Sequence, residues 1–358
     1  MNRLDDYVSR PGLSVPIVTV LDRRGEVLEA EQRAVIRYVV QDGAGADIVF
    51  AAGTNGEWNR LDNPRRQRVF EIAVEECRRL SADGKPIEAW LGVTGHNKKD
   101  TLANLARAIE LEADAAVVAP LSIQDVDDVA GFVERDIAAV FERHRRELPV
   151  FLYENADIAA PGKPLHLDPR EVATMSRLSY VRGIKVTADR DILNRFIDAR
   201  AAFISAHDFP IYAGNAYLIF DLFAAHSADP PIRGIVCGQG NMTPREWKRA
   251  WHVALNGERA LIERYRKLLD DYRRACFFNR DGREIEFGIA SLKATLAEMG
   301  VITSEAVAPG TLTFKHDERR EFARRFQELR KIAAETAEPG WLSEWQLNNR
   351  MGRAAHHG

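Results

Sequence analysis

Residues 181–187 read VRGIKVT, a short run in which apolar and β-branched side chains surround one lysine, Lys185. A run of the same kind, VFLYEN, occurs at residues 150–155, after a segment from Asp125 to His144 whose apolar residues have helical spacing. Strand-length apolar runs that alternate with helix-length amphipathic segments are typical of parallel strands joined by crossover helices. We therefore expect Lys185 to lie on a strand of a parallel sheet.

The alternation repeats eight times along the chain. The expected strands are Val15–Leu21, Asp47–Ala52, Ile87–Val93, Ala115–Ala119, Val150–Tyr153, Val181–Val186, Pro210–Ala213 and Ile232–Cys237. Helical segments separate them, among them Asn63–Leu80, and Asp168-Pro169 has the form of a helix N-cap. Eight such units match an α/β fold, the (β/α)8 TIM barrel, which typically has roughly 250 residues. A doubly wound open sheet is the alternative, but residues 20–25, VLDRRG, lack a glycine-rich dinucleotide fingerprint.

The strand pattern ends after residue 237, and the remaining sequence is mostly helical. We expect helices at Arg245–Leu255, Glu258–Cys276, Ile285–Met299 and Glu318–Ala337. The chain is thus divided into a barrel at residues 1–242, a C-terminal helical extension packed on it at 243–337, and a tail at 338–358.

Composition limits the function classes. The 358 residues are 46% hydrophobic, with 50 basic and 53 acidic side chains and a net charge of −3, so no strong field attracts nucleic acid or acidic lipid. Small molecules are the expected partners. The three cysteines are far apart, the N-terminus is acidic, and no apolar run reaches the roughly 18 residues of a membrane span. These features predict a cytoplasmic protein.

Two side chains at strand ends are candidates for catalysis, because the active site of such a barrel forms at the C-terminal ends of the strands. Lys185 alternates with Ile184 and Val186, so it points to one face of its strand. If that face is the barrel interior, burial lowers the pKa of the amine and makes it a nucleophile toward a carbonyl. The alternative is a lysine that reaches solvent or pairs with an acid. Tyr153 is either a proton relay or a core residue.

Glycine-rich polar turns follow three of the strands. Residues 53–57, GTNGE, are expected to hold an anion such as a carboxylate, because glycine permits close approach and positive φ. Residues 213–216, AGNA, and 238–241, GQGN, have the same character, and a phosphate cradle there stays open. All three could also be ordinary turns. The nine histidines do not cluster, and the pair His207-Asp208 is more typical of a loop than of a metal site, so we expect no metal or cofactor.

The ordered set of GTNGE at residues 53–57, Tyr153 and the GIK triplet at 183–185 resembles the motifs of the dihydrodipicolinate synthase and N-acetylneuraminate lyase superfamily. The resemblance runs from about Val15 to about Ile302 and places Gly214 in the family's Gly-Asp-like position. It implies a class I, metal-independent aldolase reaction on pyruvate or a 2-keto-3-deoxy sugar acid.

The resemblance also implies a role for each motif. Lys185 would form the iminium, Tyr153 would pass protons to and from the carbinolamine and the substrate hydroxyl, and Thr54 with the neighbouring backbone would hold the carboxylate. The residues expected to contact substrate are Gly53, Thr54, Asn55, Thr187, Gly214 and Asn215. Such barrels often form dimers or tetramers, and Trp341, Leu342 and Trp345 are the apolar residues of the tail that would make a homo-oligomer contact.

Three departures distinguish this sequence from the biosynthetic synthase. Asn55 replaces the second hydroxyl residue of the turn, residues 119–123 offer no tyrosine, and residues 154–158 lack the family's arginine. These losses count against lysine biosynthesis. Trp58 replaces a small residue beside the turn, and residues 159–164 are expected to form an added loop near the pocket mouth. The expected activity is a Schiff-base lyase of the aldolase type; a dehydratase, a dihydrodipicolinate synthase and a non-catalytic 2-oxo-acid-binding barrel stay open.

Overall fold

The computed structural model describes residues 4, 7–81, 86–203, 209–225 and 230–336. The pair His207-Asp208 and the tail aromatics Trp341, Leu342 and Trp345 lie outside the described residues. None of the helices in the described ranges is long and apolar enough to cross a lipid bilayer.

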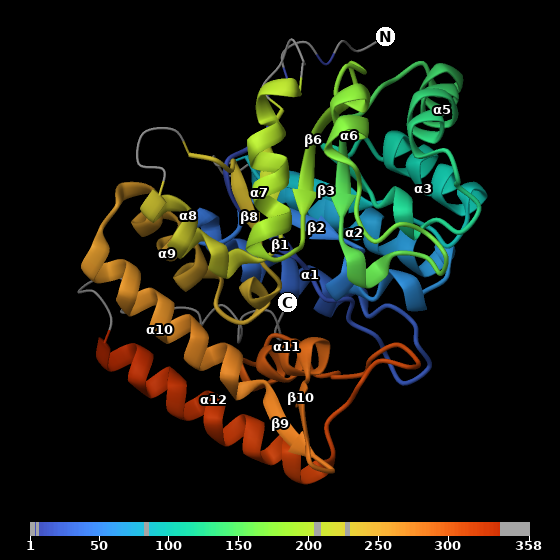
Figure 1. The fold of residues 1–358 in the computed structure, drawn as a ribbon. Helices are drawn as coiled ribbons and strands as arrows, with labels where there is room; N and C mark the ends of the chain where they lie inside the picture. Colours follow the sequence, from blue (N-terminus) through green and yellow to red (C-terminus); the bar gives the residue numbers. More distant parts are fainter. Residues whose placement is uncertain (1–3, 5–6, 82–85, 204–208, 226–229, 337–358) are drawn as a thin grey trace.

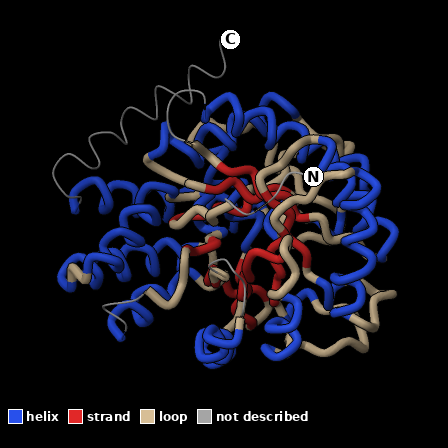
Figure 2. The backbone as a smooth tube through the Cα atoms, turned by 90° about the horizontal axis from the view of Figure 1, so that it is seen from above, coloured by secondary structure: helices blue, strands red, loops and turns tan. Residues whose placement is uncertain are grey.

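Eight parallel strands pair in chain order and close into a barrel, because β8 also pairs with β1. The strands are β1 Gly12–Pro16, β2 Ile48–Ala51, β3 Glu88–Gly92, β4 Ala115–Val118, β5 Val150–Glu154, β6 Val181–Val186, β7 Ile211–Ala213 and β8 Gly234–Val236. Seen from above, the strands form a central ring inside a ring of helices (Figure 2). The predicted TIM barrel is confirmed.

The first strand differs most from its predicted range of 15–21. It begins at Gly12 and ends at Pro16. Beyond it, side chains take the backbone N–H groups that a longer strand would use: Asn241 Oδ1 accepts from Val18 at 3.2 Å and Gln32 Oε1 accepts from Val20 at 2.8 Å. The apolar run therefore continues as a buried, irregular segment.

Helices cover the outside of the barrel (Figure 1). They are α1 Glu29–Val40, α2 Asn63–Ser81, α3 Lys98–Glu110, α4 Val129–Gly131, α5 Ala138–His144, α6 Pro169–Met175, α7 Arg190–Ala199 and α8 Ile219–Ala225. The helix predicted from Asp125 instead starts after Asp128, whose side chain accepts from the Gly131 N–H, and a π-helical turn at Phe132–Ile137 joins α4 to α5. The predicted cap Asp168 is confirmed, since its side chain accepts from the Arg170 N–H.

The C-terminal region consists of helices and one hairpin. The elements are α9 Pro244–Asn256, α10 Arg259–Ala275, β9 Phe277–Arg280, β10 Arg283–Glu286, α11 Gly288–Glu298 and α12 His316–Thr336. The α10 and α12 helices pack side by side (Figure 1). The predicted helical start at Ile285 is wrong: Asp281 and Gly282, with φ of 56° and 79°, form the tight two-residue turn of an antiparallel hairpin.

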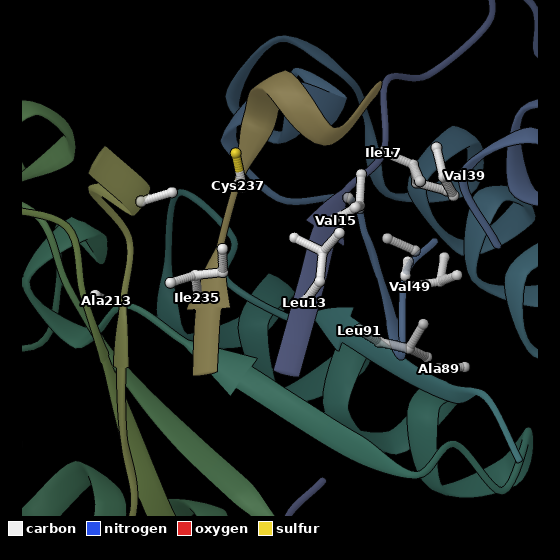
Figure 3. Packing of buried hydrophobic residues seen from close by; sticks show 14 of the residues in the cluster. Leu13, Val15, Ile17, Val39, Val49, Ala89, Leu91, Ala213, Ile235 and Cys237 are labelled. Carbon is white, nitrogen blue, oxygen red and sulfur yellow. The ribbon is translucent and has the colours of Figure 1, made fainter. Parts of the chain in front are cut away.

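Alternate residues of each strand build two apolar layers. The outer layer lies between strands and helices, and Figure 3 shows part of it, with Leu13 and Val15 of β1 beside Ile235 of β8. The inner layer fills the barrel with large side chains. Trp90 stacks on Phe151 at a centroid distance of 4.1 Å and meets Tyr212 edge-on at 5.0 Å. The barrel interior is therefore a packed aromatic core.

Candidate active site

Lys185 lies inside the barrel on β6. Parallel pairing places it level with Tyr153 of β5 and Tyr212 of β7, which both belong to the inner layer. Its side chain is 4% exposed, and its Nζ lies 3.6 Å from the centroid of the Tyr153 ring and 5.1 Å from that of Phe50. The alternative of a lysine that reaches solvent is excluded by this burial.

The environment of Lys185 favours the neutral amine. Burial removes water from the ammonium group and lowers the pKa of Lys185, while the nearby Tyr153 phenol opposes this shift in part. The ring faces around the nitrogen offer weak cation–π attraction, which does not replace the lost hydration. The geometry therefore gives Lys185 more free amine at neutral pH than a surface lysine has.

Two side chains hold the Tyr153 hydroxyl beside this amine. Its oxygen lies 3.1 Å from Thr54 Oγ1 and accepts a hydrogen bond from Asn155 Nδ2 at 3.0 Å. Burial alone would raise the pKa of Tyr153, but the positive charge of Lys185 and hydrogen bonds to the phenol outweigh it and lower the pKa. The pKa values of the amine and of the phenol are therefore both lowered where the two groups meet. The contact of Asn155 was not predicted. The sequence indicates it only by placing an amide side chain two residues after Tyr153, on the same face of the strand.

The turn at residues 53–57 brings Thr54 to this hydroxyl. Its glycines are needed for space: a Cβ on Gly53 would lie 2.9 Å from the Phe50 ring, and one on Gly56 would lie 3.2 Å from the Ile17 carbonyl oxygen. The expectation that these glycines adopt positive φ is wrong, because the positive values of 49° and 57° belong to Ala52 and Glu57. Close approach, and not φ, explains both glycines.

Glu57 ties the same turn to the C-terminal region. Its carboxylate lies 2.7 Å from Lys293 Nζ of α11, and both side chains have 0% exposure. Its other oxygen accepts hydrogen bonds from the Ala308 N–H and the Thr311 hydroxyl. The partner of Glu57 was not predicted from the sequence; Lys293 is the one basic residue of α11.

The glycine turns after β7 and β8 also serve close packing. A Cβ on Gly214 would lie 1.9 Å from Thr187 Oγ1, and one on Gly238 would lie 2.4 Å from Asn55 Nδ2. The predicted residues Asn55, Thr187 and Gly214 therefore meet neighbouring turns at the C-terminal ends of the strands. The phosphate cradle stays a prediction.

An open cleft of about 520 Å³ lies above these turns. It is lined by Asn155, Ala156, Asp157, His166, Thr187, Ala188, Asp189, Ile192, Gly214, Asn215, Ala216, Tyr217, Gln239, Arg273 and Glu286. Thr187 Oγ1 is buried there, close enough to the Tyr153 phenol to help lower the pKa of Tyr153. Arg273 and Glu286 show that the C-terminal region supplies part of the wall; neither they nor His166 were predicted.

The two other predicted features do not line this cleft. Trp58 is 5% exposed and packs against His96 at a ring distance of 5.7 Å. In the 159–164 loop, the Ala160 N–H donates to the Leu121 carbonyl and Lys163 Nζ donates to the Val126 carbonyl, each at 2.8 Å. In the described ranges, no three His, Cys, Asp or Glu side chains gather as metal ligands do.

Comparison with known proteins agrees with this geometry. The chain is 27% identical over 242 residues to an uncharacterised DapA-like lyase of Halobacterium salinarum, covering 67% of this chain and 70% of that protein. It is 24% identical over 292 residues to the 4-hydroxy-tetrahydrodipicolinate synthase of Methylococcus capsulatus, covering 81% and 89%. The crystal structure of the Escherichia coli prophage protein YagE in complex with pyruvate matches in fold, with a TM-score of 0.72, 20% identity and coverage of 89% and 98%.

The family profile matches residues 10–329, which span every strand of the barrel and most of the helical extension. The match includes the buried lysine, the tyrosine beside it and the glycine turn that holds this tyrosine. The chain therefore belongs to the dihydrodipicolinate synthetase family.

Proposed function

We propose that this protein is a class I lyase of the aldolase type, which cleaves a 4-hydroxy-2-oxo acid to pyruvate and an aldehyde through an iminium on Lys185. The observation that carries the proposal is the burial of the Lys185 amine at the C-terminal ends of the strands, beside the Tyr153 ring. A buried amine with a lowered pKa is the nucleophile that Schiff-base formation requires.

The first step is addition of the neutral Lys185 amine to the 2-keto carbon. Tyr153 supplies a proton to the carbonyl oxygen, takes one back from the attacking nitrogen, and supplies it to the hydroxyl of the carbinolamine, which leaves as water. The Thr54 hydroxyl, 3.1 Å from the Tyr153 oxygen, fixes the phenol and lies next to the backbone that would hold the substrate carboxylate. The resulting iminium draws electrons from the C3–C4 bond.

The cleft holds the rest of the substrate in this proposal. Thr187, Gly214 and Asn215 line it together, so the Thr187 hydroxyl and the Asn215 amide are polar groups that a substrate hydroxyl can bond. A volume of about 520 Å³ lies within the range of small-molecule sites. These features support a 2-keto-3-deoxy sugar acid as the substrate.

Borohydride trapping tests the proposal. The protein is incubated with pyruvate in the presence of a chelator, reduced, and weighed intact by mass spectrometry. We expect one reduced pyruvate adduct per chain in the wild type and in the control Lys267→Met, which removes a lysine that is 78% exposed. Lys185→Met should give none. An adduct that persists in Lys185→Met, or no adduct in the wild type, contradicts the proposal.

Product analysis separates the reactions that an iminium can support. Release of pyruvate and an aldehyde from a 2-keto-3-deoxy acid indicates cleavage, whereas an oxo acid that has lost water indicates dehydration. Condensation of pyruvate with an added aldehyde indicates synthase activity. Thermal stabilisation by pyruvate without any adduct indicates a binding protein.

A further inference from the structure

A histidine and a buried glutamate form a pair on the wall of the cleft. Glu154, the last residue of β5, has a side chain with 0% exposure, and its Oε1 lies 2.7 Å from His166 Nδ1. The His166 side chain is 30% exposed and lines the same cleft as Thr187 and Gly214. The pair therefore lies on the cleft wall, with Glu154 on the strand that pairs with the strand of Lys185.

The contacts of Glu154 fix which nitrogen of His166 carries a proton. Both Glu154 oxygens accept hydrogen bonds, Oε1 from His166 and Oε2 from the Leu167 N–H at 2.7 Å. His166 Nδ1 is therefore the donor, and Nε2 is left as the acceptor. In the described part of the chain Nε2 has no hydrogen-bond partner. A carboxylate that orients an imidazole in this way is the arrangement of a general base.

The surrounding chain holds the pair in place. Leu167 is 1% exposed, and Asp168 caps α6, so the residues directly after His166 are anchored. The Glu154 carbonyl accepts from the Thr187 N–H at 2.8 Å, which connects the pair to a residue that also lines the cleft. These contacts hold the His166 ring in one orientation toward the cleft.

The Tyr153 hydroxyl already has hydrogen-bond partners. It contacts Thr54 and Asn155 beside the Lys185 amine, which places it for proton exchange at the keto carbon. A substrate hydroxyl two carbons away, in the cleft, needs a second proton acceptor. His166 is the imidazole that lines the cleft.

We propose, on the basis of the proposed function, that His166 is the general base for the 4-hydroxyl of the substrate and that Glu154 is its positioning residue. His166 Nε2 accepts the 4-hydroxyl proton, the C3–C4 bond breaks, and its electron pair moves through C2 to the iminium nitrogen to give an enamine and an aldehyde. The imidazolium then returns the proton to C3. Water hydrolyses the pyruvate iminium and frees Lys185, so no other reactant is consumed.

The test compares cleavage with adduct formation in the full-length protein. Cleavage of 2-keto-3-deoxygluconate and 2-keto-3-deoxygalactonate is measured as pyruvate release, and adduct formation as borohydride trapping with pyruvate. In His166→Ala we expect kcat for cleavage to fall about 10²- to 10⁴-fold, as general bases typically contribute. Pyruvate trapping should match the wild type, and added imidazole should restore part of the cleavage rate.

Two further variants separate orientation from folding. Glu154→Gln retains an acceptor for His166 but not one for the Leu167 N–H, so kcat should fall with little change in KM, and imidazole should not restore it. His316→Gln, on an exposed residue, should leave both measurements unchanged.

The outcomes distinguish this inference from the proposed function. No pyruvate adduct in the wild type removes the proposed function. A wild-type adduct with cleavage unchanged in His166→Ala shows that another group takes the 4-hydroxyl proton and overturns the role of His166. Equal losses of trapping and cleavage in His166→Ala, without rescue by imidazole, also overturn it. A wild type that traps pyruvate and cleaves neither sugar acid overturns it as well.

Discussion

The buried ion pair between Glu57 and Lys293 offers a sharp test of how the glycine turn is supported. The substitution Lys293→Met removes an ammonium group that has 0% exposure and lies 2.7 Å from the Glu57 carboxylate. The carboxylate would keep only two neutral donors, the Ala308 N–H and the Thr311 hydroxyl. Loss of one partner of a buried pair typically costs about 3–5 kcal/mol, a large share of a total stability of about 5–15 kcal/mol.

Substitution of the other partner, Glu57, acts through the pKa of Lys293. Burial lowers the pKa of Lys293, and Glu57 opposes this shift. In Glu57→Gln the opposing charge is absent, so the pKa of Lys293 falls further and folding favours the neutral amine. The double variant Glu57→Gln/Lys293→Met should therefore lose less stability than the sum of the two single variants.

Urea unfolding followed by circular dichroism measures these differences. The control Lys267→Met breaks an exposed pair with Asp271 and should change the free energy of unfolding by less than about 0.5 kcal/mol. A loss in Lys293→Met as small as that of the control would show that the buried ion pair does not stabilise the fold, and strict additivity of the two single variants would show that the two residues are not coupled.

Three further predictions concern protons and space. Tyr153→Phe removes the phenol that partly offsets the effect of burial on the pKa of Lys185, so this pKa should fall further. Pyruvate trapping should then reach half its maximal rate at a lower pH, while the maximal rate falls; an upward shift would contradict this. Gly214→Ala places a Cβ 1.9 Å from a threonine hydroxyl oxygen and should raise KM, unlike Gly288→Ala, which has nothing within 4 Å; equal KM values would contradict the close contact. Burial raises the pKa of Glu246 to about 7. Between the ordinary pKa of a glutamate and pH 7, the folded state therefore binds more protons than the unfolded state. Stability should then fall as pH rises through this window, and Glu246→Gln should flatten the decline in thermal unfolding; an unchanged slope would contradict it.

The barrel could be predicted because its signal is local and repeated. Each strand is a short apolar run, so all eight were found, and Lys185 could be placed on its strand from the residues around it. Strand ends were harder to predict, because the run after Pro16 is as apolar as the strand itself. Its N–H groups at Val18 and Val20 bond the side chains of Asn241 and Gln32, and no local pattern indicates these contacts. The hairpin turn at Asp281-Gly282 had a local signal that the helical interpretation overlooked.

The unpredicted parts of the site depend on contacts between distant residues. Glu57 meets Lys293 from the far end of the chain, and no pattern around Glu57 indicates that partner. Glu154 and His166 are twelve positions apart, across a loop whose path follows from its packing. Sequence motifs therefore identified the amine, the phenol and the glycine turns, whereas the pair on the cleft wall required coordinates.

Peptide mapping of the reduced pyruvate adduct identifies the amine that forms the iminium. After borohydride reduction and proteolysis, tandem mass spectrometry locates the modified residue. The buried amine on β6 predicts that the modification lies on Lys185. A modification on any other lysine, or an unmodified Lys185 in protein that still turns over substrate, would contradict the account.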